Sequence, residues 1–415
     1  MSVTLLRKFL EKGVKQGRLT VIDAAGESHA FGTPTAGFPE VTVRLADKNV
    51  ARDILLDPRL GAGEAYMDGR LIVEQGDIMQ LVALLRSNNS WERGGRIRPK
   101  RGLKRLKNQL KFVAGSFNRP DSAKRNIAAH YDIGKDLYAL FLDKKYWQYS
   151  CAYWPREDMT LDEAQIAKLA HIAAKLDLKP GMRVVEIGCG WGGLAIYLAR
   201  HFDVHVTGIT LSEEQTKLAR ERITAAGLDD KIEIKLIDYR EFAKTGERFD
   251  RLVSIAMFEA VGRPQFETYF RSCANLLKDD GVMLVHTIGR LGGPGATDAF
   301  TTKYIFPGGY IPALSETLAA SEKVRLIHTD IETLRVHYAL TLREWYERCV
   351  DNKDAIIELM EERFYRMWLF YLSGATAVFE HGGMCNYQIQ YTRNRHALPL
   401  TRDYMAEGEQ ALLSD

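Results

Sequence analysis

Cysteine is scarce in this chain of 415 residues, and its pattern narrows the classes of protein to which the chain can belong. The cysteines are odd in number and widely spaced, and no two form a CxxC pair: Cys151, Cys189, Cys273, Cys349 and Cys385. Such spacing argues against a structural zinc site and against a disulfide framework. Isolated thiols are typical of the reducing cytosol, so we expect a cytoplasmic protein.

Long apolar runs and a strong net charge are missing as well. No stretch reaches the roughly 18–20 apolar residues that a membrane-spanning helix needs. Charged residues soon interrupt the apolar start of the chain, unlike a secretory signal. A formal net charge of +3 gives no indication of nucleic acid as a partner. If the protein meets lipid, we expect it to do so as a peripheral protein.

Residues 1–92 are predicted to form a small mixed α/β domain. Residues 38–45 alternate in the manner of a strand, residues 57–63 have the proline and glycines of a turn or loop, and residues 78–85 have a helical pattern. No spacing in this domain is typical of a catalytic centre.

A basic segment follows at residues 93–119. From Arg93 to Lys111 it contains nine basic residues and no acidic one. Its start resembles a linker, and apolar residues then recur at spacings of three and four: Leu103, Leu106, Leu110, Val113 and Phe117. This pattern predicts an amphipathic helix that either packs on a protein core or touches an anionic membrane surface.

From residue 120 onward the pattern alternates between strands and helices, which predicts a doubly wound, Rossmann-like α/β fold. Five buried strands are expected, at residues 183–187, 204–209, 232–237, 251–256 and 281–286. After residue 290 the alternation stops. Long helical patterns rich in aromatic residues then predict a helical cap at about residues 291–385, which is either a packed core or the wall of a tunnel for an apolar substrate.

A glycine turn follows the first of these strands. Gly188, Gly190 and Gly193 satisfy the GxGxxG pattern, in which the backbone approaches a ligand at a helix N-terminus. A dinucleotide site is one interpretation. Two features favour a class I methyltransferase instead: Glu186 precedes Gly188 by two positions, and the next strand ends in Thr210 and Leu211 without a ribose-binding acid.

Without that acid, other side chains must hold the cofactor. Thr210, Leu211 and Gln215 stand at the entry to a helix, and Asp238 and Tyr239 follow the third strand, where an adenine ring would lie.

Two further polar residues stand at strand ends. Glu259 and His286 follow the fourth strand and end the fifth, where open α/β sheets bind ligands. Glu259 comes directly after an apolar run, so its carboxylate needs a partner. Zinc held by these two residues and Cys151 is an alternative that the spacing does not favour.

Several motifs occur together, in consistent order, over about residues 120–390. They lie at residues 130–134, 149–154, 158–165, 186–193, 210–212, 257–259, 286–288, 304–309 and 337–338. Jointly they resemble the cyclopropane fatty acid synthase family, which includes the mycolic acid methyltransferases. Residues 1–92, with the segment 61–69, resemble the additional domain of the bacterial phospholipid enzymes.

The resemblance implies an S-adenosyl-L-methionine (SAM)-dependent methyltransferase with two small ligands. SAM would be held by residues matching Tyr149, Ser150, Gly188, Gly190, Thr210, Gln215 and Tyr239. A bicarbonate ion, acting as the base, would be held by residues matching Cys151, Glu259, His286 and Tyr338, with the backbone of Ile288 nearby.

The resemblance also implies a substrate and a location. The substrate would be the cis double bond of an unsaturated phospholipid acyl chain, closed to a cyclopropane ring. The enzyme would be a homodimer whose N-terminal domain docks on the inner face of the cell membrane. Two positions depart from the family: Ala375, where many members carry a cysteine, and Ala260, where a histidine is common.

Three alternatives stay open at this stage. A hydride shift in the cation would give a methyl- or methylene-branched product instead of a ring. The acceptor could be another lipid or a small amine. A non-catalytic lipid-binding protein is the third alternative, and the intact glycine turn and Glu259 argue against it.

Overall fold

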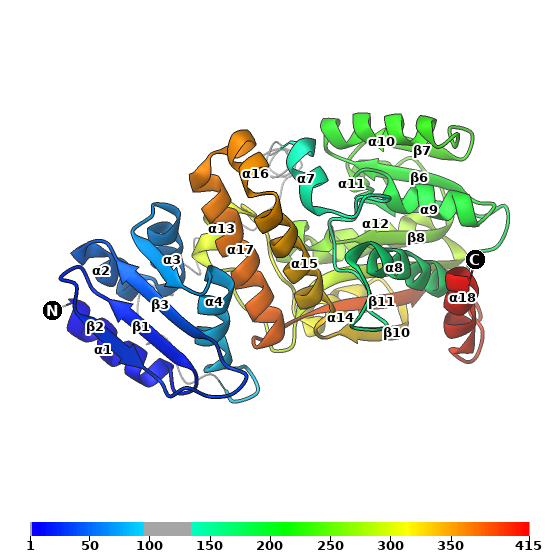
Figure 1. Cartoon of the computed structure of the whole chain (residues 1–415). Coiled ribbons are helices and arrows are strands. Elements are labelled where there is room, and N and C mark those ends of the chain that lie inside the picture. Colours follow the sequence, from blue (N-terminus) through cyan, green and yellow to red (C-terminus); the bar gives the residue numbers. More distant parts are fainter. Residues whose placement is uncertain (1, 95–133, 415) are drawn as a thin grey trace. The chain divides into compact units, whose positions relative to one another are not determined.

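The computed structural model describes residues 2–94 and 134–414, and these residues form two compact units. Figure 1 shows the course of the chain and the labels of its elements. The first unit contains residues 2–94, 297–307 and 339–384, and the second contains residues 134–296, 308–338 and 385–414. Most of the segment predicted as a cap on the catalytic domain, residues 291–385, therefore groups with the N-terminal residues. The predicted basic helix lies outside the described residues.

The first unit is built on a four-stranded sheet in the order β2-β1-β3-β4. Strand β1 pairs antiparallel with β2 and parallel with β3, and β3 pairs antiparallel with β4. The strands are β1 (Arg18–Ile22), β2 (Ser28–Phe31), β3 (Glu40–Leu45) and β4 (Leu71–Gln75). The helices are α1 (Ser2–Gly13), α2 (Lys48–Leu56), α3 (Pro58–Met67), α4 (Ile78–Ser87), α13 (Ala299–Tyr304), α16 (Lys353–Met360), α17 (Glu362–Glu380) and most of α15 (His337–Asp351).

The loop predicted at residues 57–63 is wrong, because helix α3 begins there. The Asp57 carboxylate accepts the N–H of Leu60 at 3.2 Å and caps the helix. The glycines serve close packing: a Cβ added at Gly61 would lie 2.1 Å from the Asp53 carbonyl oxygen, and one at Gly63 would lie 2.5 Å from the Phe300 ring. Small residues inside a helix were therefore mistaken for turn residues.

Within the predicted helical cap, residues 353–380 form two helices. Glu361 has a φ of 74° and separates α16 from α17. A positive φ is uncommon outside glycine, and the helical periodicity of the sequence does not indicate a break at this residue.

The second unit is built on a seven-stranded sheet in the order β10-β11-β9-β8-β5-β6-β7. Strands β5 to β9 pair in parallel with their neighbours β5–β6, β6–β7, β5–β8 and β8–β9, and β10 pairs antiparallel with β11. The strands are β5 (Arg183–Ile187), β6 (His205–Thr210), β7 (Ile232–Leu236), β8 (Phe249–Ile255), β9 (Leu277–Arg290), β10 (Ile327–Leu334) and β11 (Met384–Thr392). All five predicted strands are present, and β10 and β11 were not predicted.

Helices cover both faces of this sheet. On one face Val184 and Val206 pack with residues of α8, α9 and α10, and on the other Val185 and Ile209 pack with residues of α11, α12 and α14. The helices are α7 (Lys135–Phe141), α8 (Leu161–Leu176), α9 (Gly193–His201), α10 (Glu213–Ala225), α11 (Tyr239–Phe242), α12 (Phe266–Leu276), α14 (Leu314–Glu322) and α18 (Asp403–Ser414), with short 3-10 turns at Phe258–Ala260 and Arg263–Gln265. The predicted doubly wound α/β fold is confirmed. Within the described part of the chain, every helix is too short or too polar to span a bilayer.

Candidate active site

The glycine turn joins β5 to α9 as predicted. Gly188, Gly190 and Gly192 have φ values of 83°, 52° and 76°, in the left-handed region that favours glycine. A Cβ added at Gly188 would lie 2.9 Å from the side chain of Met257, whereas one added at Gly190 would meet no atom within 4 Å. The turn is therefore backed by protein at Gly188 and open at Gly190, where a ligand can reach the backbone.

The predicted cofactor residues lie along the same edge, because neighbouring parallel strands end together. Thr210 ends β6, and its hydroxyl donates to Gln215 Oε1 at 2.9 Å; both side chains are buried. The Thr210 carbonyl oxygen accepts the N–H of Ile237 at 3.0 Å, which joins the end of β6 to the end of β7. Leu211 lies in the turn between Thr210 and α10.

Asp238 and Tyr239 follow β7 at this edge. The Asp238 carboxylate caps α11 and accepts hydrogen bonds from Nε and Nη2 of Arg240 at 2.8 and 2.7 Å. The Tyr239 ring packs edge-on against Tyr269 with ring centroids 5.5 Å apart. Both residues lie at the strand end where we expect the adenine ring. Arg240 already donates to both oxygens of the Asp238 carboxylate, however.

Glu186 is a buried residue of β5 that holds the glycine turn from behind. Its carboxylate accepts the N–H of Ala195 in the first turn of α9, and its Oε2 has no hydrogen-bond partner among the described residues. Burial raises the pKa of Glu186 to about 8, and the nearby ammonium of Lys168 opposes that rise. In the structure Glu186 anchors the helix after the turn, and direct contact with SAM stays a prediction.

Lys168, which the sequence analysis did not single out, links this region to the predicted cofactor segment. Its fully buried ammonium donates to Gln148 Oε1 and, at 3.2 Å, to Ser150 Oγ. Burial lowers the pKa of Lys168 to about 8, and attraction to Asp143, Cys151 and Glu186 partly offsets this effect.

The segment that carries Tyr149, Ser150 and Cys151 is held from two helices. The Tyr149 ring lies 5.1 Å from that of Tyr138 in α7, and the Ser150 carbonyl oxygen accepts the side-chain N–H of Gln165 in α8 at 3.0 Å. Cys151 is buried, and its thiol donates to the carbonyl oxygen of the next residue at 3.2 Å.

Glu259 lies in the 3-10 turn after β8. Its Oε1 accepts the N–H of Ile288 at 2.6 Å, and its buried Oε2 has no partner among the described residues. Burial raises the pKa of Glu259 to about 7, although hydrogen bonds from Ile288 and Thr287 act in the opposite direction. A carboxyl group of this kind takes up and releases a proton near neutral pH, as proton-transfer groups do.

His286 is completely buried in β9, on the face of the sheet that α8 covers. Its Nε2 lies 3.0 Å from the side-chain amide of Asn386, and its Nδ1 lies 3.1 Å from that of Gln388. Burial and the charges of Lys168 and Lys175 hold the pKa of His286 well below its usual range. The histidine is therefore neutral, with both ring nitrogens in contact with β11.

Tyr338 is buried at the start of α15. The residue before it, His337, accepts the N–H of Trp154 on its Nδ1 at 2.9 Å, which links this helix start to the segment after Cys151.

One pair of the predicted ion-binding residues is in direct contact, and the other residues are related to one another only through intermediate residues. Glu259 touches Ile288 directly, Cys151 and His286 both lie near Lys168, and Tyr338 is linked to the Cys151 segment through its neighbour. Within the described residues, Cys151, Glu259 and His286 do not form a group close enough to share a metal ion.

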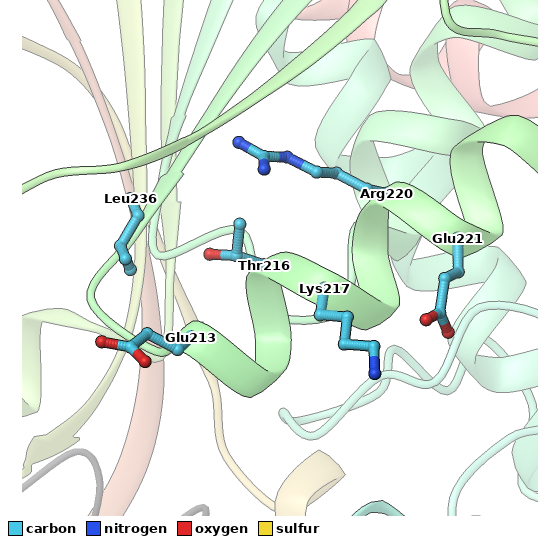
Figure 2. A pocket seen from close by; sticks show the side chains of 6 residues that line it. All are labelled: Glu213, Thr216, Lys217, Arg220, Glu221 and Leu236. Carbon is cyan, nitrogen blue, oxygen red and sulfur yellow. The ribbon is translucent and has the colours of Figure 1, made fainter.

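A surface depression lies between α10 and the edge strand β7 (Figure 2). Arg220 borders it and donates to the carbonyl oxygen of Ile234 at 2.7 Å. The lining consists of Glu213, Thr216, Lys217, Arg220, Glu221 and Leu236, none of which is a predicted site residue. This depression is separate from the glycine turn.

The polar residues that the sequence analysis missed form a stripe on α8. Gln165, Lys168, His171 and Lys175 recur at spacings of three and four, and all are buried. Their periodicity was visible in the sequence, but a polar stripe on a helix ordinarily faces solvent.

Comparison with known proteins gives the family. The sequence model described as mycolic acid cyclopropane synthetase matches residues 118–389. The cyclopropane-fatty-acyl-phospholipid synthase of Escherichia coli K12 is 37% identical over 373 residues, which cover 87% of this chain and 90% of that protein. Cyclopropane mycolic acid synthase 3 of Mycobacterium tuberculosis is 37% identical over 270 residues, which cover 62% and 93%.

Solved structures agree. The cyclopropane synthase MmaA2 from Mycobacterium tuberculosis is 34% identical and superposes with a TM-score of 0.61 over 65% of this chain and 97% of that one. The mycolic acid cyclopropane synthase CmaA1, complexed with SAH and CTAB, has the same identity, TM-score and coverage. The chain therefore belongs to the mycolic acid cyclopropane synthetase family, and its fold is that of a SAM-dependent methyltransferase.

Proposed function

We propose that this chain transfers a methylene unit from SAM to cis double bonds in the acyl chains of membrane phospholipids, forming cyclopropane rings. One observation favours phospholipid over mycolic acid as the substrate. The similarity to the Escherichia coli phospholipid enzyme covers 87% of the chain and so must include residues before 118, whereas the mycolic acid relative covers 62%.

The residues at the glycine turn fit SAM. Gly190 leaves open space beside the backbone, and the buried Thr210–Gln215 pair offers polar groups at the neighbouring strand end. When bound there, SAM supplies an electrophilic methyl group on a sulfonium.

The chemistry then needs a dry site and a base. The electron pair of the double bond forms a carbon–carbon bond to the methyl carbon as the bond to sulfur breaks, which leaves a cation on the acyl chain. A base removes a proton from the new methyl group, and the freed electron pair closes the ring. Water must be excluded, because it would trap the cation.

Glu259 is the residue whose geometry best supports the proton transfer. Ile288 fixes one carboxylate oxygen, and the other is buried and has no partner among the described residues. We propose that Glu259 orients a bicarbonate ion, with Cys151, His286, Tyr338 and the backbone of Ile288 around it. Such an ion would supply a base small enough to reach the methyl carbon. Glu259 gives this assignment most of its support. The N–H of Ile288 already donates to Glu259, and both ring nitrogens of His286 already contact side chains of β11, so these groups contribute less to binding the ion.

Access to phospholipid implies contact with a membrane surface. Within the described residues there is no spanning helix, and residues 93–111 are strongly basic. We therefore propose that the protein binds the anionic inner face of the cell membrane peripherally, from the cytoplasm. That it acts as a homodimer is proposed from the family resemblance.

Lipid analysis tests this function. The chain is expressed in a bacterial host that makes unsaturated phospholipids but no cyclopropane lipids, with Glu259→Gln as the control. We expect a gain of one methylene unit on unsaturated species and ring protons in the NMR spectrum of the lipids. Branched-chain signals in place of ring protons would show that the product is a methyl- or methylene-branched lipid. Unaltered lipids from a folded chain that binds SAM would refute the function.

A further inference from the structure

His286 belongs to a row of buried polar side chains that joins α8, β11 and β9. Lys175 Nζ donates to Gln388 Oε1 at 2.9 Å, and Gln388 Nε2 lies 3.1 Å from His286 Nδ1. His286 Nε2 lies 3.0 Å from Nδ2 of Asn386. All four residues are at most 2% exposed, so water cannot readily replace any of these contacts.

The direction of each hydrogen bond follows from the lysine. An ammonium group only donates, so the atom of Gln388 that faces Lys175 must be the amide oxygen. The amide nitrogen of Gln388 then faces His286 and must donate to Nδ1. An Nδ1 that accepts carries no proton, and a neutral imidazole must therefore carry its proton on Nε2.

Asn386 completes the assignment. With the proton on Nε2, the atom of Asn386 facing the ring should be an acceptor, yet the amide is placed with its nitrogen there. The Asn386 oxygen has no hydrogen-bond partner among the described residues. Turning the amide over brings this oxygen to Nε2, whose N–H it then accepts, and the orientation of an amide follows from such a network.

We propose that Gln388, oriented by the Lys175 ammonium, is a positioning residue that fixes His286 as the neutral imidazole with its proton on Nε2. The charged and titratable groups that face the ring are Lys168, His171 and Lys175 from α8 and Glu332 from β10. Three of these four are basic residues, and their positive charges also disfavour a second proton on the ring.

The consequence for catalysis rests on the function proposed above. A histidine fixed in this way can donate one hydrogen bond from Nε2 and cannot take up the proton that ring closure releases. The Nε2 proton goes to Asn386 and Nδ1 accepts from Gln388, so His286 is a fixed neutral group, and the released proton is left to Glu259 and its bound anion.

The tautomer can be read directly by 15N NMR of the full chain labelled at histidine. The His286 signal is the one that His286→Gln removes. In the unmodified chain we expect the proton on Nε2 throughout the neutral pH range. In Gln388→Glu the carboxylate beside Lys175 can only accept, so Nδ1 should become protonated and turnover should fall roughly 10- to 100-fold, the scale for partners that orient a site residue.

Gln390 provides the matched control. It is a second buried glutamine on the same face of β11, but its side-chain N–H groups go to the Lys175 carbonyl oxygen at 2.5 Å and the Tyr404 hydroxyl at 2.8 Å. Gln390→Leu should keep the proton of His286 on Nε2 even if the chain loses stability.

Two results would overturn the proposal: a proton on Nδ1 in the unmodified chain, or an unchanged tautomer in Gln388→Glu. The first is read on the unmodified chain once the His286 signal is assigned, so the test survives a Gln388→Glu variant that does not fold. Because the NMR signal needs no lipid, failure of the proposed function and failure of this inference are separate results.

Discussion

Strand β11 has two buried faces with opposite chemistry. One face places Cys385, Tyr387, Ile389 and Tyr391 in an apolar core with α12. The other face carries Asn386, Gln388 and Gln390, and all three are at most 1% exposed. The polar stripe of α8 satisfies the second face, through Lys175 above all. The apolar face thus contributes hydrophobic packing, and the polar face holds side chains in fixed orientations beside His286.

The division holds in part in β5 and β9. Val185 and Val285 point into the apolar core with α12, whereas Glu186 and His286 lie on the α8 side beside the apolar Val184 and Leu284. Buried polar groups are costly unless they are paired. A fold that keeps so many buried polar side chains on one face of its sheet therefore gains fixed side-chain orientations there.

The largest expected effect is on catalysis, at the strand ends where the polar face meets the site. Glu259→Gln removes the group that we place at the proton transfer, so turnover should fall about 100-fold or more, the lower end of what acid–base groups contribute. SAM affinity should change little. Turnover on unsaturated phospholipid vesicles and calorimetric SAM binding measure the two effects, and a parallel loss of SAM binding would contradict the assignment.

The next effect is on stability at the centre of the polar face. Lys168→Met leaves the buried Glu186, Gln148 and Ser150 without their cation and should lower the free energy of unfolding by about 3 kcal/mol. Urea denaturation measures the loss. In the double variant with Glu186→Gln the cost should be smaller than the sum of the single costs; additivity to within about 0.5 kcal/mol would show that the two residues do not interact.

A smaller effect is expected on the apolar face. Ile389→Val removes one methylene from the core and should cost about 1 kcal/mol of stability. Turnover per folded molecule should stay unchanged, because Ile389 points away from His286. A clear loss of turnover at full folding would remove the distinction between the two faces.

The last expected effect is a pH dependence of stability. In the folded chain Glu259 keeps its proton up to about pH 7, whereas its ordinary pKa is 4.5. The folded state therefore binds more protons between these values, and this group makes the free energy of unfolding fall as pH rises through that window. Glu259→Gln should flatten the slope between pH 4.5 and 7 in denaturation series, and an unchanged slope would place the carboxyl in solvent.

The sequence predicted the sheet better than it predicted the site. The five parallel strands are short apolar runs, and the glycine turn has a spacing with a clear mechanism, so both were found. Strand β11 alternates polar and apolar residues, a pattern typical of a strand with one face in solvent. It also follows a long helical segment, so nothing in the sequence indicated that it belongs to the same sheet.

The polar network was missed for a related reason. Lys168, Lys175 and Gln388 are ordinary surface residues by type, and only the packing of α8 on the sheet encloses them. Glu259 was found because its apolar neighbours made a lone acid conspicuous. The loop predicted at Gly61 and Gly63 failed because composition does not tell a glycine in a turn from one at a close helix contact.

The origin of the proton released at ring closure tests the central claim most directly. The purified chain is given SAM with a fully deuterated methyl group and vesicles of unsaturated phospholipid, and the product is analysed by mass spectrometry. If a base beside Glu259 removes a deuteron from the transferred methyl group, the product keeps two of the three deuterons. A product that keeps all three would contradict the account, because the proton would then have come from the acyl chain.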